Sequence, residues 1–130
     1  MSAEIVWDNE AKTLCCVEMR GEWKWQDFSD KIKEAYALIA TFDYKVNFIF
    51  GFYSNLPEGE KALPHLTFAG QQPANIRHTV IVNQSGLASK LFMQSIISSV
   101  DKANEWNGPK FLDTMEEARA YLKRLKELED

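Results

Sequence analysis

One stretch near the middle of the chain, residues 44–52 (YKVNFIFGF), constrains the fold more than any other. Its even positions are all large and apolar: Tyr44, Val46, Phe48, Phe50 and Phe52. The odd positions begin polar, with Lys45 and Asn47, and become apolar at Ile49. A period of two is typical of a β-strand, and aromatic and β-branched residues suit a pleated, half-buried surface. We therefore expect an interior strand of one sheet, with one buried face at its start and two at its end.

The first third of the chain predicts a hairpin followed by a helix. Residues 4–8 and 13–19 are short strand-like runs separated by a polar turn, a pattern typical of an antiparallel hairpin. Residues 24–40 carry apolar side chains at the three-and-four spacing of one helical face. These side chains are Trp25, Phe28, Ile32, Ala35, Tyr36 and Ile39.

Three prolines punctuate residues 54–75, which are the least readable part of the sequence. We expect an irregular first half and a helical turn or two after Pro64, because proline is tolerated at the first helical position. Residues 76–83, around the run Val-Ile-Val at 80–82, predict a fourth strand.

The C-terminal third predicts two helices around a short strand. Ser85 is a candidate N-cap for a helix over residues 86–104 that Asn107-Gly108-Pro109 would end. Its expected inner stripe is Leu87, Leu91, Phe92, Ile96, Val100 and Ala103. After a strand at residues 110–112, Thr114 and Glu117 have the spacing of a capping box for the last helix. The expected buried face of that helix is Ala118, Tyr121, Leu122, Leu125 and Leu128.

This order of elements predicts a single α/β domain over residues 1–130, with a mostly parallel five-stranded sheet and an N-terminal antiparallel hairpin. Right-handed crossovers would place the helices mainly on one face of the sheet. The expected other face holds Lys45, Asn47 and Ile49 of the central strand, with Thr79, Ile81 and either Val6 or Trp7. Because that surface is partly apolar, we expect it to form a two-fold homodimer, unless residues 54–75 fold over it and leave a monomer.

Composition and charge limit the classes of partner. The chain has 130 residues and a net charge of −4, and nucleic-acid binding needs a basic surface. No apolar run is long enough to span a bilayer, and the N-terminus lacks the features of a secretory signal. The adjacent Cys15 and Cys16 point to opposite faces of a strand, so we expect reduced thiols and a cytoplasmic protein. No Cys or His spacing indicates a metal, and we expect no cofactor.

Three stretches resemble the STAS-like domains, also described as SpoIIAA-like, and the resemblance covers nearly the whole chain. They are GEWKWQDF at 21–28, QQPAN at 71–75 and FLDTMEEA at 111–118. Within this family, the sequence looks closest to a bacterial group of short, stand-alone domains. The resemblance implies a non-enzymatic regulatory or protein-interaction module, and it also makes an apolar small ligand possible.

In the STAS-like anti-sigma-factor antagonists, a phosphorylated serine or threonine follows an aspartate just after the central strand. The matching region here is Gly51-Phe52-Tyr53-Ser54-Asn55, in which no aspartate precedes Ser54. We therefore expect that Ser54 is not a regulatory phosphosite.

Ligands of open parallel sheets bind beyond the carboxyl ends of the strands. The residues expected at that rim are Arg20, Trp23, Lys24, Tyr53, Ser54, Asn55, Asn83, Gln84 and Ser85. Aromatic walls with a few polar groups suit a small-molecule pocket, and the free N–H groups after Asn83 could hold an anion. The alternative is that Trp23 covers the edge of the core while the polar residues cap loops and a helix.

No catalytic motif is present. His65 and His78 have no recognisable nucleophile or metal partner, so we expect structural roles for both. The two main hypotheses are a protein-interaction module and a carrier of a small apolar ligand at the rim, and an enzyme of unknown type ranks third.

Overall fold

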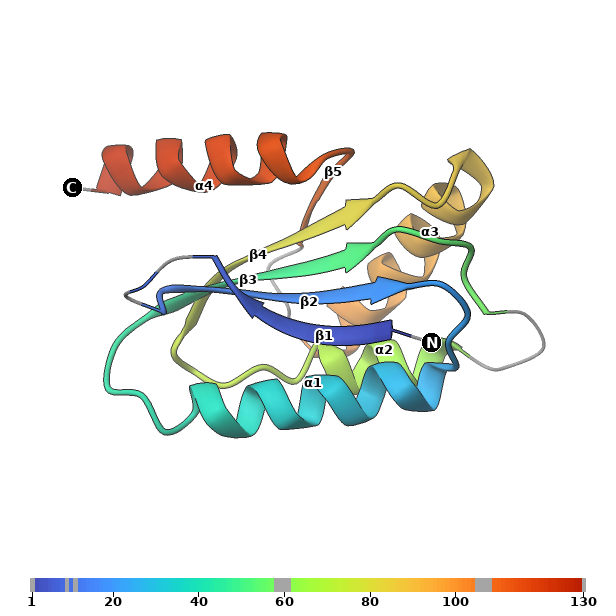
Figure 1. Cartoon of the computed structure of the whole chain (residues 1–130), viewed down its shortest axis with the longest axis horizontal. Coiled ribbons are helices and arrows are strands. Elements are labelled where there is room, and N and C mark those ends of the chain that lie inside the picture. Colours follow the sequence, from blue (N-terminus) through green and yellow to red (C-terminus); the bar gives the residue numbers. More distant parts are fainter. Residues whose placement is uncertain (1, 9, 11, 58–61, 105–108, 130) are drawn as a thin grey trace.

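A computed structural model describes residues 2–8, 10, 12–57, 62–104 and 109–129. Its strands are β1 (Ser2–Trp7), β2 (Leu14–Arg20), β3 (Val46–Phe52), β4 (Ile76–Asn83) and β5 (Lys110–Leu112). Its helices are α1 (Trp25–Ile39), α2 (Ala62–Ala69), α3 (Leu87–Asn104) and α4 (Met115–Glu129). The strands lie in the order β1-β2-β3-β4-β5, with β1 antiparallel to β2 and every other pair parallel (Figure 1). The predicted α/β fold, with its five-stranded sheet and N-terminal hairpin, is confirmed.

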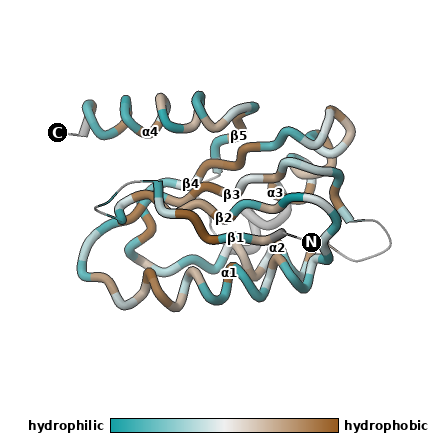
Figure 2. Tube along the Cα trace, in the orientation of Figure 1, coloured by the Kyte–Doolittle hydropathy of each residue, from teal (hydrophilic) through white to brown (hydrophobic). Residues whose placement is uncertain are grey.

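β3 is the middle strand, and six of its seven residues are buried. The predicted interior position is confirmed, although the strand begins at Val46 rather than at Tyr44. Tyr44 instead stacks on Phe42 before the strand, with ring centroids 5.0 Å apart. The hydrophobic positions concentrate in the strands, whereas α4 is largely hydrophilic (Figure 2).

The main core lies between the sheet and the three helices α1, α2 and α3. Each of these helices connects a strand to its parallel neighbour, and right-handed crossovers between consecutive strands place them on one side. All six apolar residues predicted for the buried face of α1 are buried. Phe28 packs its ring against Phe50 and Phe52, with centroids 5.9 and 5.7 Å away. The predicted inner face of α1 is therefore confirmed.

α4 lies on the opposite face of the sheet from α1 (Figure 1). It makes a second, smaller core whose buried members are Cys16, Ile49, Val80, Val82, Ala118 and Leu122. The apolar residues of this face need a cover, and α4 supplies it. The expectation that this face stays open to a second copy, or is covered by residues 54–75, was wrong, because α4 covers it, while α2, within residues 54–75, packs with α1 on the main core.

Two residues assigned to that second face belong to the main core instead. Ile81 is paired in register with Phe50, while Val80 and Val82 point to the side of α4. Trp7 packs against the main core, and Val6 packs against the second one. Because side chains alternate between the two faces along a strand, Ile81 and Trp7 point away from the second face and cannot take part in an association through it.

The N-termini of two helices differ from their predictions. α2 begins at Ala62, so Pro64 lies inside its first turn rather than before it. The first N–H groups of a helix have no intrahelical partner, so a proline there loses no hydrogen bond. Ser85 is not the N-cap of α3, because the Gly86 carbonyl accepts the hydrogen bond from the Lys90 N–H (3.0 Å). Gly86 has a φ of +105°, a conformation that favours glycine.

The N-cap of α4 is confirmed at Thr114, whose Oγ1 accepts a hydrogen bond from the Glu117 backbone N–H (3.1 Å). On the buried side of α4, Ala118 and Leu122 are buried and Tyr121 and Leu125 are partly buried. Leu128 is 77% exposed, so its predicted burial was wrong.

The predicted inner stripe of α3 was wrong at three positions. Leu87, Leu91 and Phe92 are exposed, while Met93 and Ile97 are the residues that α3 buries in the core and Ile96 packs partly against it. The predicted burial of Val100 and Ala103, and the predicted helix end at Asn107 and Gly108, lie outside the described side chains and residues.

Candidate functional site

The predicted rim lies where β2, β3 and β4 end side by side. Met19 is paired in register with Phe52, and Phe52 with Asn83. The parallel sheet therefore brings the ends of these three strands to one edge, as expected from their direction. Whether they form a ligand site depends on where each side chain points.

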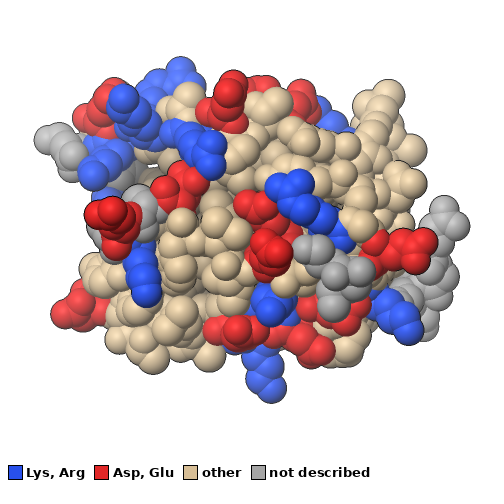
Figure 3. Space-filling model, viewed as in Figure 1, with Lys and Arg blue, Asp and Glu red and all other residues tan. Residues whose placement is uncertain are grey.

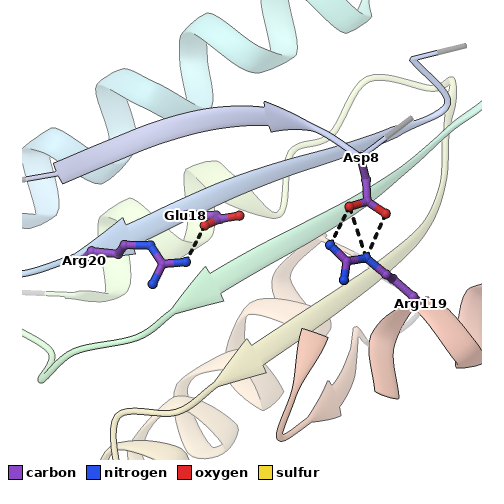
Figure 4. A network of polar contacts seen from close by, with 4 residues as sticks. All are labelled: Asp8, Glu18, Arg20 and Arg119. Atoms are coloured by element: carbon purple, nitrogen blue, oxygen red, sulfur yellow. Dashed lines mark hydrogen bonds and ion pairs between the residues drawn. The ribbon is translucent and has the colours of Figure 1, made fainter. Parts of the chain in front are cut away.

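Arg20 and Tyr53 stack on the surface of this rim. The Arg20 guanidinium lies 4.0 Å from the centroid of the Tyr53 ring and donates to Glu18 Oε2 at 2.7 Å (Figure 4). Burial and then the charge of Glu18 raise the pKa of Tyr53, so its phenol stays neutral at physiological pH. A Cβ at Gly51 would lie only 2.8 Å from the Tyr53 ring, which explains the glycine there. Arg20 therefore contacts both Glu18 and Tyr53 at the surface of the rim.

Trp23 and Asn83 turn inward, and each is only 6% exposed. The Trp23 ring stacks on Phe52 (5.8 Å between centroids) and meets Trp25 edge-on (4.9 Å). Trp23 therefore covers the edge of the core, as the alternative interpretation expected. Within the described chain, neither Trp23 Nε1 nor Asn83 Nδ2 has a hydrogen-bond partner. Two buried donors flanking Phe52 thus lack an acceptor, which is uncommon in folded proteins.

The remaining polar residues of the rim organise loops and helix starts. Ser54 Oγ donates to the Gly21 carbonyl (2.7 Å), and the Lys24 N–H donates to Asp27 Oδ2 (2.9 Å) at the start of α1. The Ser85 N–H donates to Asn83 Oδ1 (2.9 Å), and the Ser85 hydroxyl contacts the same oxygen.

Of the two other predicted rim residues, Asn55 is exposed. Gln84 is also exposed, and its backbone N–H donates to the Phe52 carbonyl (2.8 Å). The rim residues thus lie near one edge, but most of their polar atoms serve local structure.

His65 contacts Ser29 Oγ through Nδ1 at 2.5 Å, which ties α2 to α1. A serine beside a histidine is the geometry of a nucleophile and its base, and catalysis also needs a group that orients the histidine. Among the hydrogen bonds of the described residues, no carboxylate contacts the other ring nitrogen of His65. The arrangement fits the predicted structural role of His65.

The described ranges contain no group of three His, Cys, Asp or Glu residues that could hold a metal ion. In the same part of the chain, no helix has both the length and the apolar character needed to cross a membrane.

Sequence reasoning missed an apolar surface on α3. We call it the α3 outer face; its exposed members are Leu87, Ala88, Leu91, Phe92, Ser95 and Ser98. Leu87, Leu91 and Phe92 are 72%, 57% and 47% exposed. None of the six side chains is charged, and the nearest charged residue of α3, Lys90, pairs with Asp113 Oδ1 (2.9 Å). Met93 and Ile97, four residues apart, face the core instead, and because Phe92 and Ile96 have the same spacing, the sequence alone does not single out either stripe.

Comparison of the chain with protein-family models, with curated proteins and with solved structures found no match in any of the three. The similarity to STAS-like domains therefore stays a prediction from the sequence.

Proposed function

We propose that this chain is a non-enzymatic protein-interaction module of the STAS-like type, and that it docks through the α3 outer face. The main observation behind this proposal is that Leu87, Leu91 and Phe92 are exposed and take no part in the core. Met93 and Ile97 already fill the space between α3 and the sheet. Exposed apolar clusters on a protein surface usually mark interaction sites.

The partner we propose is a second copy of the chain. Because the chain carries a net charge of −4 and like charges placed opposite one another across an interface repel, a second copy is best met at an uncharged surface. The α3 outer face has that property. Its bulky residues lie in the first two turns of the helix, and Ser95 and Ser98 follow them along the same face. In an antiparallel pairing about a two-fold axis, the large side chains of one helix would lie on the small ones of the other.

The exposed area sets the expected affinity. Burying the exposed parts of three large apolar side chains on each of two copies contributes on the order of 5–10 kcal/mol. Association costs roughly 4–15 kcal/mol in lost freedom of motion. The most favourable difference between these two terms is about 6 kcal/mol, so the dimer should be weak, with a dissociation constant of roughly tens of micromolar at the tightest.

Sedimentation velocity from about 1 µM to about 1 mM tests this proposal over the expected range of affinity. We expect the wild type to dimerise with rising concentration and Leu91→Lys to remain a monomer. Leu63→Lys is the matched control, because Leu63 is 49% exposed on α2 and is not a member of the α3 outer face. A wild type that stays monomeric, or a loss of the dimer in Leu63→Lys alone, contradicts the proposal.

The second candidate is a carrier of a small apolar molecule. A groove of about 410 Å³ between β5 and α4 supports it, with Leu112, Tyr121 and Leu125 among its lining residues. That volume is in the range of small-molecule sites. The groove lies along the edge strand rather than at the predicted rim. Native mass spectrometry of freshly purified protein separates the two candidates, because a co-purified mass favours the carrier and a dimer without added mass favours the module.

A further inference from the structure

The groove between β5 and α4 lies at an edge of the sheet. β5 is the last strand in the sheet order and, among the residues that the structure describes, it pairs with β4 alone. The outer edge of β5 therefore presents backbone N–H and C=O groups that no strand of the described chain uses. The same strand lines one side of the groove of about 410 Å³, with Lys110 and Leu112.

An apolar stripe of α4 continues where the sheet stops. Tyr121, Leu125 and Leu128 have the spacing of one side of a helix, and all three line the groove. Tyr121 and Leu125 are partly buried, whereas Leu128 is 77% exposed. β5 has only three residues, so the sheet is too short at this edge to cover the whole stripe. An additional strand beside β5 would supply the missing cover.

The two ends of the groove carry opposite charges. Glu117 lies in the first turn of α4, and Arg124 lies about two turns later, roughly 10 Å along the helix axis. α4 follows β5 and runs back along the sheet, so Arg124 lies toward the same end of the groove as Lys110 (Figure 1). Lys and Arg side chains gather at the upper left of the space-filling view, over the C-terminal half of α4 (Figure 3). A complementary ligand therefore has an acidic group at one end and a basic group at the other.

We propose that the edge of β5 and this groove bind an extended segment of a partner protein as a sixth strand. Main-chain hydrogen bonds to a sheet edge hold such a segment, and pockets for its alternate side chains give specificity. A strand rises about 3.3 Å per residue, so the charged ends of the groove are about three to four strand residues apart, close to the length of β5. The expected segment has an apolar residue flanked, at alternate positions, by one acidic and one basic residue.

A short edge strand that contains a lysine also prevents uncontrolled pairing between sheets, which is a purely structural reason for the length of β5 and for Lys110. That reason does not extend to the apolar stripe of α4, because an edge protected from pairing gains nothing from an exposed Leu128 beside it. A small molecule would use the stripe but not the main-chain edge. The groove shares no lining residue with the α3 outer face, so this proposal and the proposed dimer stand or fall separately.

NMR titration of the full chain with the capped peptide acetyl-TETITKT-amide tests the proposal. In an extended conformation the acidic, the apolar and the basic side chain of this peptide lie on one face. We expect saturable shifts of the amide signals around residues 110–112 and 120–128. Leu128→Lys should weaken binding about fivefold, the factor for losing roughly half of the burial of one leucine. Leu38→Lys is the control, because it makes the same change at a leucine of α1 that is 42% exposed, and it should leave the affinity unchanged.

Two N-methylated forms of the peptide separate strand pairing from binding through side chains alone. Methylation of every even residue removes the N–H groups of one peptide edge, and methylation of the odd residues between them removes those of the other edge. Strand pairing uses one edge, so we expect one form to bind at least about tenfold more weakly and the other to keep its affinity. Equal affinity of the two forms overturns the proposal, and so do shifts of the unmodified peptide that do not saturate. Equal weakening by Leu38→Lys and Leu128→Lys also overturns it, because binding would then not depend on the groove.

Discussion

Replacing Phe48 by alanine tests the core of the fold most directly. Phe48 is at the middle of β3 and is 0% exposed. Its ring contacts Tyr36 of α1 edge-on, with centroids 5.4 Å apart, and Phe50 of the same strand at 4.8 Å. These neighbours belong to a sheet and a helix, so they cannot close fully around the space that a truncated side chain leaves. We expect Phe48→Ala to lower the free energy of unfolding by about 3–5 kcal/mol.

Phe92→Ala is the matched control, because it removes the same atoms from a side chain that is 47% exposed. We expect a loss below about 1 kcal/mol there, since exposed positions contribute little to stability. Urea denaturation of both variants is monitored by tryptophan fluorescence and by circular dichroism. Each denaturation curve gives a midpoint and a slope, and the two values together give the free energy of unfolding. If Phe48→Ala does not fold, Phe48→Leu, with an expected loss of about 1–2 kcal/mol, keeps the comparison measurable.

Equal midpoints for Phe48→Ala and Phe92→Ala would refute the reasoning. A larger loss at Phe92 than at Phe48 would show that α3 faces the core through the stripe expected from the sequence, with Leu87, Leu91 and Phe92 inside. The proposed docking surface would then be absent.

Three further predictions follow from local contacts. Thr114→Ala should lower stability by about 1 kcal/mol in urea denaturation, because it removes the N-cap of α4, and an unchanged midpoint would argue against that cap. Burial raises the pKa of the Cys15 and Cys16 thiols to about 12, so both should resist iodoacetamide at pH 8 in the folded protein and react only after unfolding. Since an unfolded thiol ionises near pH 8.5, the stability held by these neutral thiols should be complete below that pH and decline as the pH rises towards 12. Asp8 and Arg119 form a paired ion contact between the β1–β2 turn and α4, with distances of 2.6–3.1 Å (Figure 4). Because the pair is partly exposed, a double-mutant cycle with Asp8→Asn and Arg119→Gln should give a coupling energy of about 0.5–1 kcal/mol. A coupling energy of zero would contradict the contact.

The buried face of α1 could be predicted from the sequence, whereas that of α3 could not. In α1 the charged residues lie largely off a single apolar stripe, so the period fixes which side faces the sheet. In α3 the run Leu91-Phe92-Met93 and the pair Ile96-Ile97 place apolar residues on more than half of the helix circumference. Several rotations then satisfy the same pattern, and only the packing of Met93 and Ile97 against the sheet selects one.

The candidate sites show a similar division. The sequence predicted that the ends of β2, β3 and β4 share one edge, because this follows from strand direction alone. It left open whether Trp23 lines a pocket or covers the edge of the core, and whether polar residues such as Ser54 bind a ligand or cap loops, because those choices depend on local packing and hydrogen bonds.

The position of α4 decides which surface is left for association with a second copy. The second face of the sheet presents Ile49, Val80 and Val82, and these residues need an apolar cover. α4 supplies that cover with Ala118 and Leu122. The sheet face is then no longer available for association, so the surface for a second copy has to lie elsewhere. The exposed apolar side chains of α3, on the other side of the molecule, are the surface that this arrangement leaves uncovered.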